Sequence, residues 1–275
     1  MDLRTLAKTY LPAPVADTLK VAKYNLELRT FKKRVVSHRY GDCGFQMHIE
    51  DRIAREWYDK DWDLPHEIRF LSRHGLKPGV LVYDLGAHQC LIAMLLAKQV
   101  GPNGMVVAVE ANEHNVDVAE RNLEINGVSN VSVIHAMVSS TVGIDRASAS
   151  FNSSRDNSSI ASETVGTLTL DDMADRLGVP NVVFMDIEGF EIEALKGARE
   201  TLQKGCTWFV ELHGDEQLSR YGATNADILR YFPPEAYTAF LCEEDGTAFR
   251  ALRGSPPENR CFLVFVPESQ EPPQP

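Results

Sequence analysis

An aspartate followed by a glycine turn ends the first apolar segment that reads as a buried strand. Val80–Asp84 is this segment, Gly86 comes two residues later, and a helical apolar pattern begins at Leu91. Such a turn lies at the carboxyl edge of a sheet, where ligands approach the backbone of open α/β proteins. A dinucleotide fingerprint would place its first glycine near position 84. Because a carboxylate repels pyrophosphate and attracts ammonium, Asp84 favours a ligand with an amino-acid part and disfavours NAD.

A second acid ends the next predicted strand. Glu110 closes the apolar run Met105–Glu110, 24 residues beyond Gly86. An acidic side chain in this place accepts hydrogen bonds from both hydroxyls of a ribose, although a strand-end acid can also simply face solvent. Taken with Asp84, it predicts a nucleoside with a positively charged amino-acid tail and no phosphates. S-adenosylmethionine (SAM) is such a ligand.

Two more pairs of polar residues follow the fourth and fifth predicted strands. Asp186 and Glu188 form one pair and Glu211 and His213 the other, each at i and i+2 and therefore on one side of its strand. Asp186 and Glu188 could serve as a base, as acceptors for a substrate hydroxyl or as ligands of a hard metal ion. A histidine held by a carboxylate is a candidate proton acceptor. Exposed strand-end acids and a structural histidine are the competing interpretations.

No metal site is assigned from these residues, because two carboxylates and a histidine could bind magnesium or nothing. The cysteines are scattered without a Cys-x-x-Cys pair, which argues against zinc and against disulfides. An odd number of cysteines in an acidic chain, with no basic-then-apolar leader pattern in the first thirty residues, predicts reduced thiols and a cytoplasmic location. The five cysteines are Cys43, Cys90, Cys206, Cys242 and Cys261.

In the order and spacing of its motifs, the chain resembles the FkbM family of SAM-dependent methyltransferases from Tyr40 to Gly214. The later blocks are those that separate this family from other methyltransferases. The matching blocks are Lys77-Pro78-Gly79, Asp84-Leu85-Gly86-Ala87, Glu110-Ala111-Asn112, Asn122-Leu123-Glu124-Ile125-Asn126-Gly127, Thr169-Leu170-Asp171-Asp172, Met185-Asp186-Ile187-Glu188-Gly189-Phe190-Glu191, Leu195-Lys196-Gly197-Ala198 and Val210-Glu211-Leu212-His213.

The resemblance implies methyl transfer from SAM, most simply to the oxygen of a hydroxylated small molecule such as a sugar or polyketide. Catalytic roles would fall on Asp186, Glu188, Glu211 and His213, whereas Glu191 reads as a structural charge at a helix N-terminus. The residues that the resemblance places at the cofactor are Glu67, Asp84, Gly86, Ala87, His88, Glu110, Ala111 and Asn112.

Two segments depart from the family pattern. The family usually has Asn-x-Gly where this chain has His88-Gln89-Cys90, and lysine where this chain has Met185. These departures leave open an alternative, a methyltransferase-fold protein that binds its ligand without catalysis. An oxidoreductase with a nucleotide cofactor is a further alternative, which Asp84 disfavours.

Strand patterns alternate with helical patterns from residue 80 onward, which predicts βαβ crossovers and a mainly parallel sheet. The fold class is therefore α/β, a Rossmann-like class I methyltransferase domain with seven strands and an antiparallel last strand. Its predicted strands are Val80–Asp84, Met105–Glu110, Val131–Val138, Val182–Asp186, Trp208–Leu212, Tyr237–Glu243 and Cys261–Val266. Its predicted helices are Leu91–Val100, Asn115–Asn126 and Glu191–Gln203.

The segments before and after this domain have other patterns. Residues 1–35 read as helical, 43–53 as a short hairpin or edge strand, and 57–75 as helical again. The expected division is a helical N-terminal segment with a hairpin over 1–75, the methyltransferase domain over 76–267, and a disordered tail over 268–275. Within the domain, the Ser- and Asn-rich segment 148–162 reads as a mobile connector or an active-site lid.

The composition limits the partners. The formal net charge of −11 argues against nucleic acid, which requires a basic surface. The most apolar stretch, Leu91–Val100, is far shorter than the ~20 residues that span a bilayer, so no membrane partner is expected. A hydroxylated small-molecule acceptor remains as the expected partner, and the sequence does not specify an oligomeric state.

Overall fold

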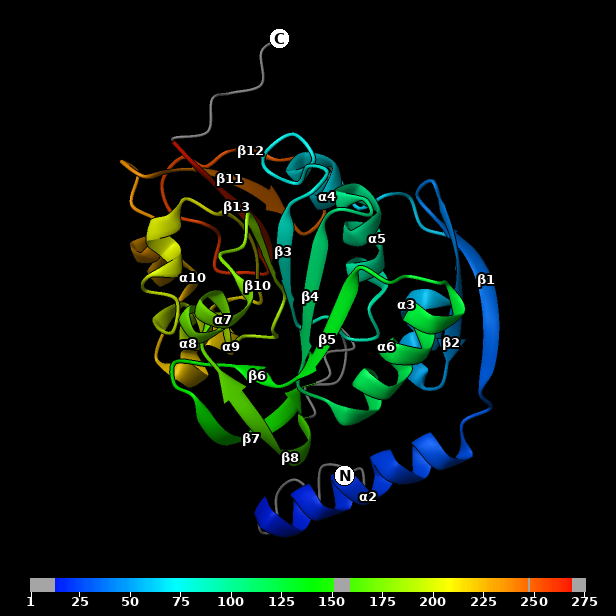
Figure 1. Ribbon diagram of the computed structural model, residues 1–275. Coiled ribbons are helices and arrows are strands. Elements are labelled where there is room, and N and C mark those ends of the chain that lie inside the picture. The colour runs from blue at the N-terminus through cyan, green and yellow to red at the C-terminus, as the bar shows by residue number, and fades with distance from the viewer. Residues whose placement is uncertain (1–12, 151–158, 247, 269–275) are drawn as a thin grey trace.

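An eight-stranded, mainly parallel sheet forms the centre of the protein (Figure 1). The computed structural model describes residues 13–150, 159–246 and 248–268. The strand order is β12-β11-β13-β10-β9-β3-β4-β5, and the five strands from β10 to β5 run parallel. The strands of this sheet are β3 (Leu81–Leu85), β4 (Met105–Glu110), β5 (Val131–His135), β9 (Val182–Met185), β10 (Thr207–Leu212), β11 (Tyr237–Glu243), β12 (Arg250–Ala251) and β13 (Cys261–Pro267).

The antiparallel last strand that the sequence predicts is confirmed. β13 runs antiparallel to both of its neighbours, β10 and β11. Seven of the eight strands correspond to the seven predicted ones, and the eighth is the two-residue β12 at the outer edge of β11. The parallel strands therefore end at one edge of the sheet, which is where the predicted site residues follow them.

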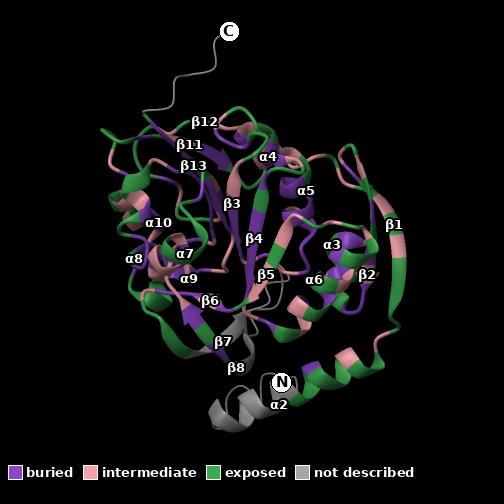
Figure 2. Ribbon diagram, viewed as in Figure 1, coloured by how far each residue is buried: buried purple, intermediate pink, exposed green. Residues whose placement is uncertain are grey.

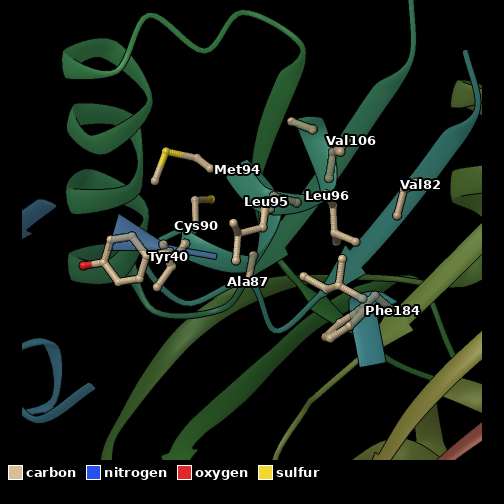
Figure 3. Close-up of a cluster of buried hydrophobic side chains, with 14 of the residues drawn as sticks. Tyr40, Val82, Ala87, Cys90, Met94, Leu95, Leu96, Val106 and Phe184 are labelled. Carbon is tan, nitrogen blue, oxygen red and sulfur yellow. The ribbon is translucent and has the colours of Figure 1, made fainter. Parts of the chain in front are cut away.

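Helices cover both faces of the sheet and make two hydrophobic clusters. Successive residues of β3 alternate between them: Val82 lies in the cluster with α5, and Tyr83 in the cluster with α7 and α8. Figure 3 shows the first cluster, in which Met94 and Cys90 point into the same apolar space. The helices of this part are α5 (Leu91–Val100), α6 (Glu113–Ile125), α7 (Leu170–Leu177), α8 (Glu191–Lys196), α9 (Asp215–Leu218) and α10 (Asn225–Ile228), with single turns η1 (Thr201–Lys204), η2 (Ser219–Tyr221) and η3 (Leu229–Tyr231).

The central strands are continuous apolar runs because both of their faces are covered. Figure 2 shows them mostly buried, whereas β1 and the described side chains of α2 are mostly exposed. No helix among the described residues combines the length and apolarity needed to cross a bilayer. All five cysteines fall within the described residues and are free thiols.

The predicted helix Glu191–Gln203 is wrong in its extent. α8 ends at Lys196, and the chain resumes a helical turn only at Thr201. The side chain of Asp171 accepts hydrogen bonds from the backbone N–H groups of Glu200 and Thr201. This carboxylate caps the turn Thr201–Lys204, so the predicted helix is divided into two separate helical pieces.

The N-terminal part also differs from the prediction. The described helix covers 13–30 of the predicted 1–35, and residues 1–12 lie outside the described residues. Of the short hairpin or edge strand predicted at 43–53, residues 43–49 form a strand and a helix begins at 52. Its partner at 34–40 lies partly in the predicted helix, where β-branched residues favour a strand. Residues 57–75 are not one helix, because one short helix ends at 58 and the next begins at 66. The elements are α2 (Ala13–Thr30), β1 (Arg34–Tyr40), β2 (Cys43–Ile49), α3 (Arg52–Tyr58) and α4 (His66–Leu71).

The Ser- and Asn-rich segment lies mainly outside the described residues, which resume at 159. Its two ends are strands rather than irregular chain, because they continue an antiparallel pair. Of the predicted connector or lid at 148–162, residues 151–158 lie outside the described residues, and of the predicted tail at 268–275, residues 269–275 do. This small sheet has the order β6-β8-β7. Its strands are β6 (Met137–Val138), β7 (Gly143–Ser150) and β8 (Ser159–Leu168).

Two asparagines, Asn122 of α6 and Asn126 just after its end, fasten the β1–β2 hairpin to the sheet domain. Asn122 accepts a hydrogen bond from the His48 backbone N–H at 2.8 Å, and Asn126 accepts one from Gln46 at 2.9 Å. The Asn122 amide also donates to the backbone carbonyl of Gln89 at 3.0 Å. The asparagines of the sequence block 122–127 therefore join the hairpin to the turn after β3.

Asp51 makes a second, buried connection between these parts. Its carboxylate caps α3 through Ala54 N–H at 2.7 Å, and accepts from the Gln89 amide at 2.6 Å. The third contact is with His114 Nε2 at 3.0 Å. Burial disfavours the charged form, but the hydrogen bonds from His114, Ala54 and Gln89 and the positive field of His88 outweigh it and lower the pKa of Asp51 to about 2.

We expect Asp51→Asn to reduce the free energy of unfolding at pH 7 by about 2 kcal/mol, from the pKa difference between folded and unfolded chains. Because the folded-state pKa is lowered, this stabilisation is complete above pH 4 and is lost as the pH falls toward 2. Urea unfolding between pH 7 and pH 2 measures it. Asp63→Asn, at an exposed carboxylate, is the control and should change stability by less than about 0.5 kcal/mol. Equal pH slopes for the wild type and Asp51→Asn would contradict the assignment.

Candidate functional site

A single cavity of about 760 Å³ lies at the carboxyl ends of the parallel strands. This size suits a small-molecule ligand. All of the residues predicted for the site, except His213, contribute to its wall. They are Glu67, Asp84, Gly86, Ala87, His88, Glu110, Ala111, Asn112, Asp186, Glu188 and Glu211.

The turn after β3 brings the predicted cofactor residues next to the predicted catalytic acids. Gly86 has φ +85, and the N–H groups of Gly86 and Ala87 both donate to the Val109 carbonyl, at 2.9 and 3.1 Å. A Cβ at Gly86 would lie 1.8 Å from the Asp186 carbonyl oxygen. Only glycine fits here, so the backbone of the predicted cofactor turn touches the backbone that carries the predicted catalytic acids.

Asp84 presents an unsatisfied oxygen at this point. The residue is 2% exposed, and its Oδ2 has no hydrogen-bond partner among the described residues. Burial, followed by the charges of Asp186 and Glu110, raises the pKa of Asp84 to about 8. A buried polar atom without a partner is costly. A cationic group bound in the cavity would supply the missing interaction.

Glu110 connects the two loops that follow β3 and β4. One carboxylate oxygen accepts from the backbone N–H of His88 and the other from that of Asn112, both at 2.8 Å. Asn112 then caps α6 through the N–H of Asn115 at 3.0 Å. The acid predicted to bind a ribose is thus held at the cavity wall by both of its neighbouring loops.

Of the residues where the chain departs from the family pattern, His88 lines the cavity, whereas Cys90 and Met185, with the intervening Gln89, point away from it. Cys90 has φ +65, the left-handed region that favours glycine, and its side chain lies in the apolar cluster of Figure 3. Gln89 is fully buried and donates to Asp51. Met185 is buried in the cluster on the opposite face of the sheet. None of these three side chains is among those that line the cavity.

The predicted catalytic residues converge on His213. Its Nδ1 lies 2.8 Å from Glu191 Oε1, within hydrogen-bond distance. Its Nε2 faces carboxylate oxygens of Asp186 at 3.4 Å, Glu188 at 3.4 Å and Glu211 at 3.5 Å. The sequence pairs His213 with Glu211, but the residue that holds the imidazole is Glu191. We call these five residues the His213 cluster.

Charge and burial compete within the His213 cluster. Burial opposes the charge on His213, but the hydrogen bond and charge of Glu191, with the charges of Glu188 and Asp186, raise its pKa to about 10. An imidazole that already carries a proton cannot take another. Burial first, then carboxylate neighbours, raises the pKa of Asp186 to about 6 and that of Glu211 to about 7.

Three residues of the site were missed or misjudged from the sequence. Arg260, just before β13, forms an ion pair with Glu211 and lines the cavity. Tyr58 at the end of α3 places its hydroxyl 2.6 Å from His88 Nδ1. Glu191, interpreted as a helix-terminal charge, is fully buried against His213. A lone arginine or tyrosine carries no motif, so no signal in the sequence pointed to the first two.

Glu67 lines the cavity, and Glu211 is the charged neighbour that acts on its carboxyl group. Burial and the charge of Glu211 raise its pKa to about 7. His66 Nδ1 lies 3.6 Å from its carboxylate. The acid that influences the pKa of Glu67 is therefore Glu211 and not Glu110, the residue predicted to bind the ribose.

Comparisons with known proteins agree with the sequence motifs. The family model of the methyltransferase FkbM domain matches residues 84–239. A stretch of 79 residues is 33% identical to the protein-L-isoaspartate O-methyltransferase of Methanococcoides burtonii; it covers 28% of this chain and 39% of that protein.

Solved structures show a distant likeness. The FkbM methyltransferase of Methylobacillus flagellatus is 18% identical with a TM-score of 0.43, over 68% of this chain and 44% of that one. A SAM-dependent methyltransferase of Aquifex aeolicus is 17% identical with a TM-score of 0.45, over 79% of this chain and 93% of that one. The chain thus spans less than half of the Methanococcoides and Methylobacillus proteins.

Proposed function

Because the chain belongs to the FkbM family of SAM-dependent methyltransferases, we propose that it transfers the methyl group of SAM to a hydroxyl oxygen of a small polar acceptor. One observation carries the proposal. A single cavity is lined both by the acids suited to SAM, Asp84 and Glu110, and by the carboxylates that surround His213. Gly86 brings these two groups together through its contact with the Asp186 backbone.

The cofactor would bind along the turns after β3 and β4. The free oxygen of Asp84 would accept from the ammonium group of SAM, which is the partner that this buried atom lacks. Glu110 would accept from the ribose hydroxyls, and Ala87, His88 and Ala111 would supply the adjoining wall. The predicted role of Glu67 shifts to the acceptor side.

The reaction needs alignment and removal of one proton. SAM would supply the methyl group and leave as S-adenosylhomocysteine, with the electron pair of the broken carbon–sulfur bond on sulfur. A carboxylate of the pair Asp186 and Glu188 would accept the hydroxyl proton as general base. The cavity would hold the acceptor beside the cofactor.

The charges of the cavity favour a neutral acceptor over an anionic one. Asp186, Glu188 and Glu211 face the acceptor region, and Arg260 supplies one positive charge that pairs with Glu211. A phosphate or carboxylate acceptor would meet this negative field, whereas the hydroxyls of a sugar or polyketide would donate to it. The volume of about 760 Å³ holds a cofactor and a small molecule.

Turnover rather than binding alone is the better-supported alternative. The two departures that argued for a non-catalytic protein, Cys90 and Met185, are buried in core clusters away from the cavity. The test is incubation with methyl-labelled SAM and a panel of hydroxylated small molecules, with detection of labelled product and of S-adenosylhomocysteine. Label on a hydroxyl oxygen supports the proposal. SAM binding without transfer to any acceptor, or transfer to nitrogen or carbon, contradicts it.

We expect Glu110→Ala to weaken SAM binding by about 100-fold, because two hydrogen bonds to a charged acceptor are worth about 3 kcal/mol together. Calorimetric titration with SAM and with S-adenosylhomocysteine measures the change. Glu120→Ala, an exposed acid on the helix α6 that follows Glu110, is the control. Glu110 also joins two loops, so the variant could lose SAM binding by unfolding. A melting curve of Glu110→Ala, together with the more conservative Glu110→Gln, separates the loss of ribose contacts from the loss of folding. Unchanged affinity in a folded Glu110→Ala protein would contradict the role.

A further inference from the structure

We propose that Asp186, Glu211 and His213 form a binding site for a divalent transition-metal ion next to the acceptor. Among the described residues, these three have ligand atoms within 4.8 Å of one another. They come from two adjacent parallel strands, β9 and β10, whose carboxyl ends supply Asp186 on one side and Glu211 and His213 on the other. Metal binding is a property of these residues alone, whereas the catalytic role given to the ion below rests on the proposed O-methyl transfer.

The first argument is the orientation of His213. Glu191 is fully buried, and the oxygen that contacts His213 Nδ1 also accepts the Gly189 N–H at 3.0 Å. This carboxylate is therefore fixed, and it holds the imidazole with Nε2 directed at the cavity acids. A buried carboxylate on one ring nitrogen of a histidine, with the other nitrogen facing more oxygen ligands, is the arrangement found around protein-bound metal ions.

The second argument is spacing. The three Nε2-to-oxygen distances of 3.4, 3.4 and 3.5 Å exceed normal hydrogen-bond lengths. Two ligands of a tetrahedral ion with bonds of about 2.1 Å are about 3.4 Å apart. In an octahedral site, ligands on opposite sides of the ion are about 4.2 Å apart. The widest separation in the site, up to 4.8 Å, requires only a small inward movement of a side chain.

The third argument is unbalanced charge. Glu211 Oε1 and Glu188 Oε2 are buried, and their partners are charged groups: Arg260 and His213 for Glu211, and His213 for Glu188. The side chain of Glu211 is 7% exposed, and its charge is met by an ion pair with Arg260. Against this guanidinium and the protonated imidazole of His213 stand the carboxylates of Asp186, Glu188, Glu191 and Glu211, and a bound ion would displace the proton from His213 Nε2. A divalent cation would balance the excess.

The ligand chemistry selects the class of ion. One imidazole nitrogen with two carboxylates suits Mn²⁺ or Zn²⁺, whereas Mg²⁺ prefers an all-oxygen shell. Bound there, the ion would take the acceptor hydroxyl as a further ligand and lower its pKa. Glu188 lies outside the three-residue ligand set, so with the ion bound its carboxylate would accept the proton.

The test is a titration of the EDTA-treated, dialysed full-length protein with MnCl₂, followed by the electron paramagnetic resonance signal of free Mn²⁺. We expect one ion per chain, displaced by Zn²⁺. Asp186→Asn and Glu211→Gln should each weaken binding by about 100-fold or more, and Glu191→Gln by about 10- to 100-fold. Glu244→Gln is the matched control, because this exposed acid lines the same cavity outside the ligand set. His213→Gln tests the role of the nitrogen ligand, and a melting curve checks that this variant is folded.

The outcomes separate this site from the proposed function. No stoichiometric binding, or equal affinity in the wild type and Asp186→Asn, overturns the metal site. SAM titration of the metal-free protein runs in parallel, so SAM binding and methyl transfer without Mn²⁺ binding would leave the function standing and remove the ion. If Mn²⁺ binds and the variants weaken this binding as expected, but no hydroxyl is methylated, the metal site stands and the proposed O-methyl transfer is overturned.

Discussion

Replacement of Asp186 by asparagine is expected to slow methyl transfer by about 10²- to 10⁴-fold, the usual contribution of a positioned proton acceptor. Asparagine keeps the shape of the side chain but removes the negative charge. Asp186 follows β9 directly, and its backbone contacts the turn at Gly86, so its carboxylate lies where cofactor and acceptor meet. The SAM affinity should change by less than about threefold, because no cofactor contact is assigned to this side chain.

Single-turnover kinetics with labelled SAM and calorimetry on the same preparation measure the two effects separately. In the metal-free protein, Glu188→Gln should have a smaller effect, since Asp186 still carries a charge beside the acceptor. Glu244→Gln, on the cavity wall outside the His213 cluster, is the control for a general change in cavity charge. A loss of SAM binding parallel to the loss of rate would place Asp186 at the cofactor and contradict the assignment.

Replacement of Gly86 by alanine is expected to lower the free energy of unfolding by about 3 kcal/mol or more. A Cβ at this position would lie 1.8 Å from the Asp186 carbonyl oxygen, which is backbone and cannot rotate away. Separation of the two strand ends would cost about 1–3 kcal/mol, and the φ of +85 adds about 1–2 kcal/mol for an L-residue. The altered turn should also abolish SAM binding, because Asp84 and Ala87 flank it.

Gly79→Ala is the matched control for this variant. Gly79 has nearly the same φ, +87, but nothing lies within 4 Å of its ideal Cβ. Its replacement should therefore cost only the backbone strain, about 1–2 kcal/mol. Urea unfolding of both variants measures the difference. If the two glycines cost the same, the contact between the β3 turn and Asp186 does not constrain the site.

The sequence alone determined where the acids of the site lie. Asp84, Glu110, Asp186 and Glu211 each come at or just after the end of an apolar strand. Strands joined by helical crossovers run parallel, so their carboxyl ends meet at one edge of the sheet whatever their order. The fold class and the cavity that these residues share therefore follow from local patterns and spacing.

Local patterns were less reliable where tertiary contacts decide the ends of elements. The interruption after Lys196 depends on Asp171, which caps the following turn from another helix. The pairing of β1 with β2 depends on a hairpin that α6 holds through Asn122 and Asn126. Neither partner is close in sequence to the segment that it shapes, so periodicity in that segment does not reveal it.

The tertiary structure alone decided how the acids are paired. Arg260 reaches Glu211 because β13 inserts antiparallel beside β10, which places the chain before Cys261 next to the end of β10. Glu191 reaches His213 because α8 begins directly after the β9 edge, where β10 also ends. Residue type and spacing predict which functional groups lie at the strand ends, whereas these pairings depend on which strands are neighbours. Strand order is set by the packing of the whole chain, so the identity of the group that holds His213 could only come from the fold.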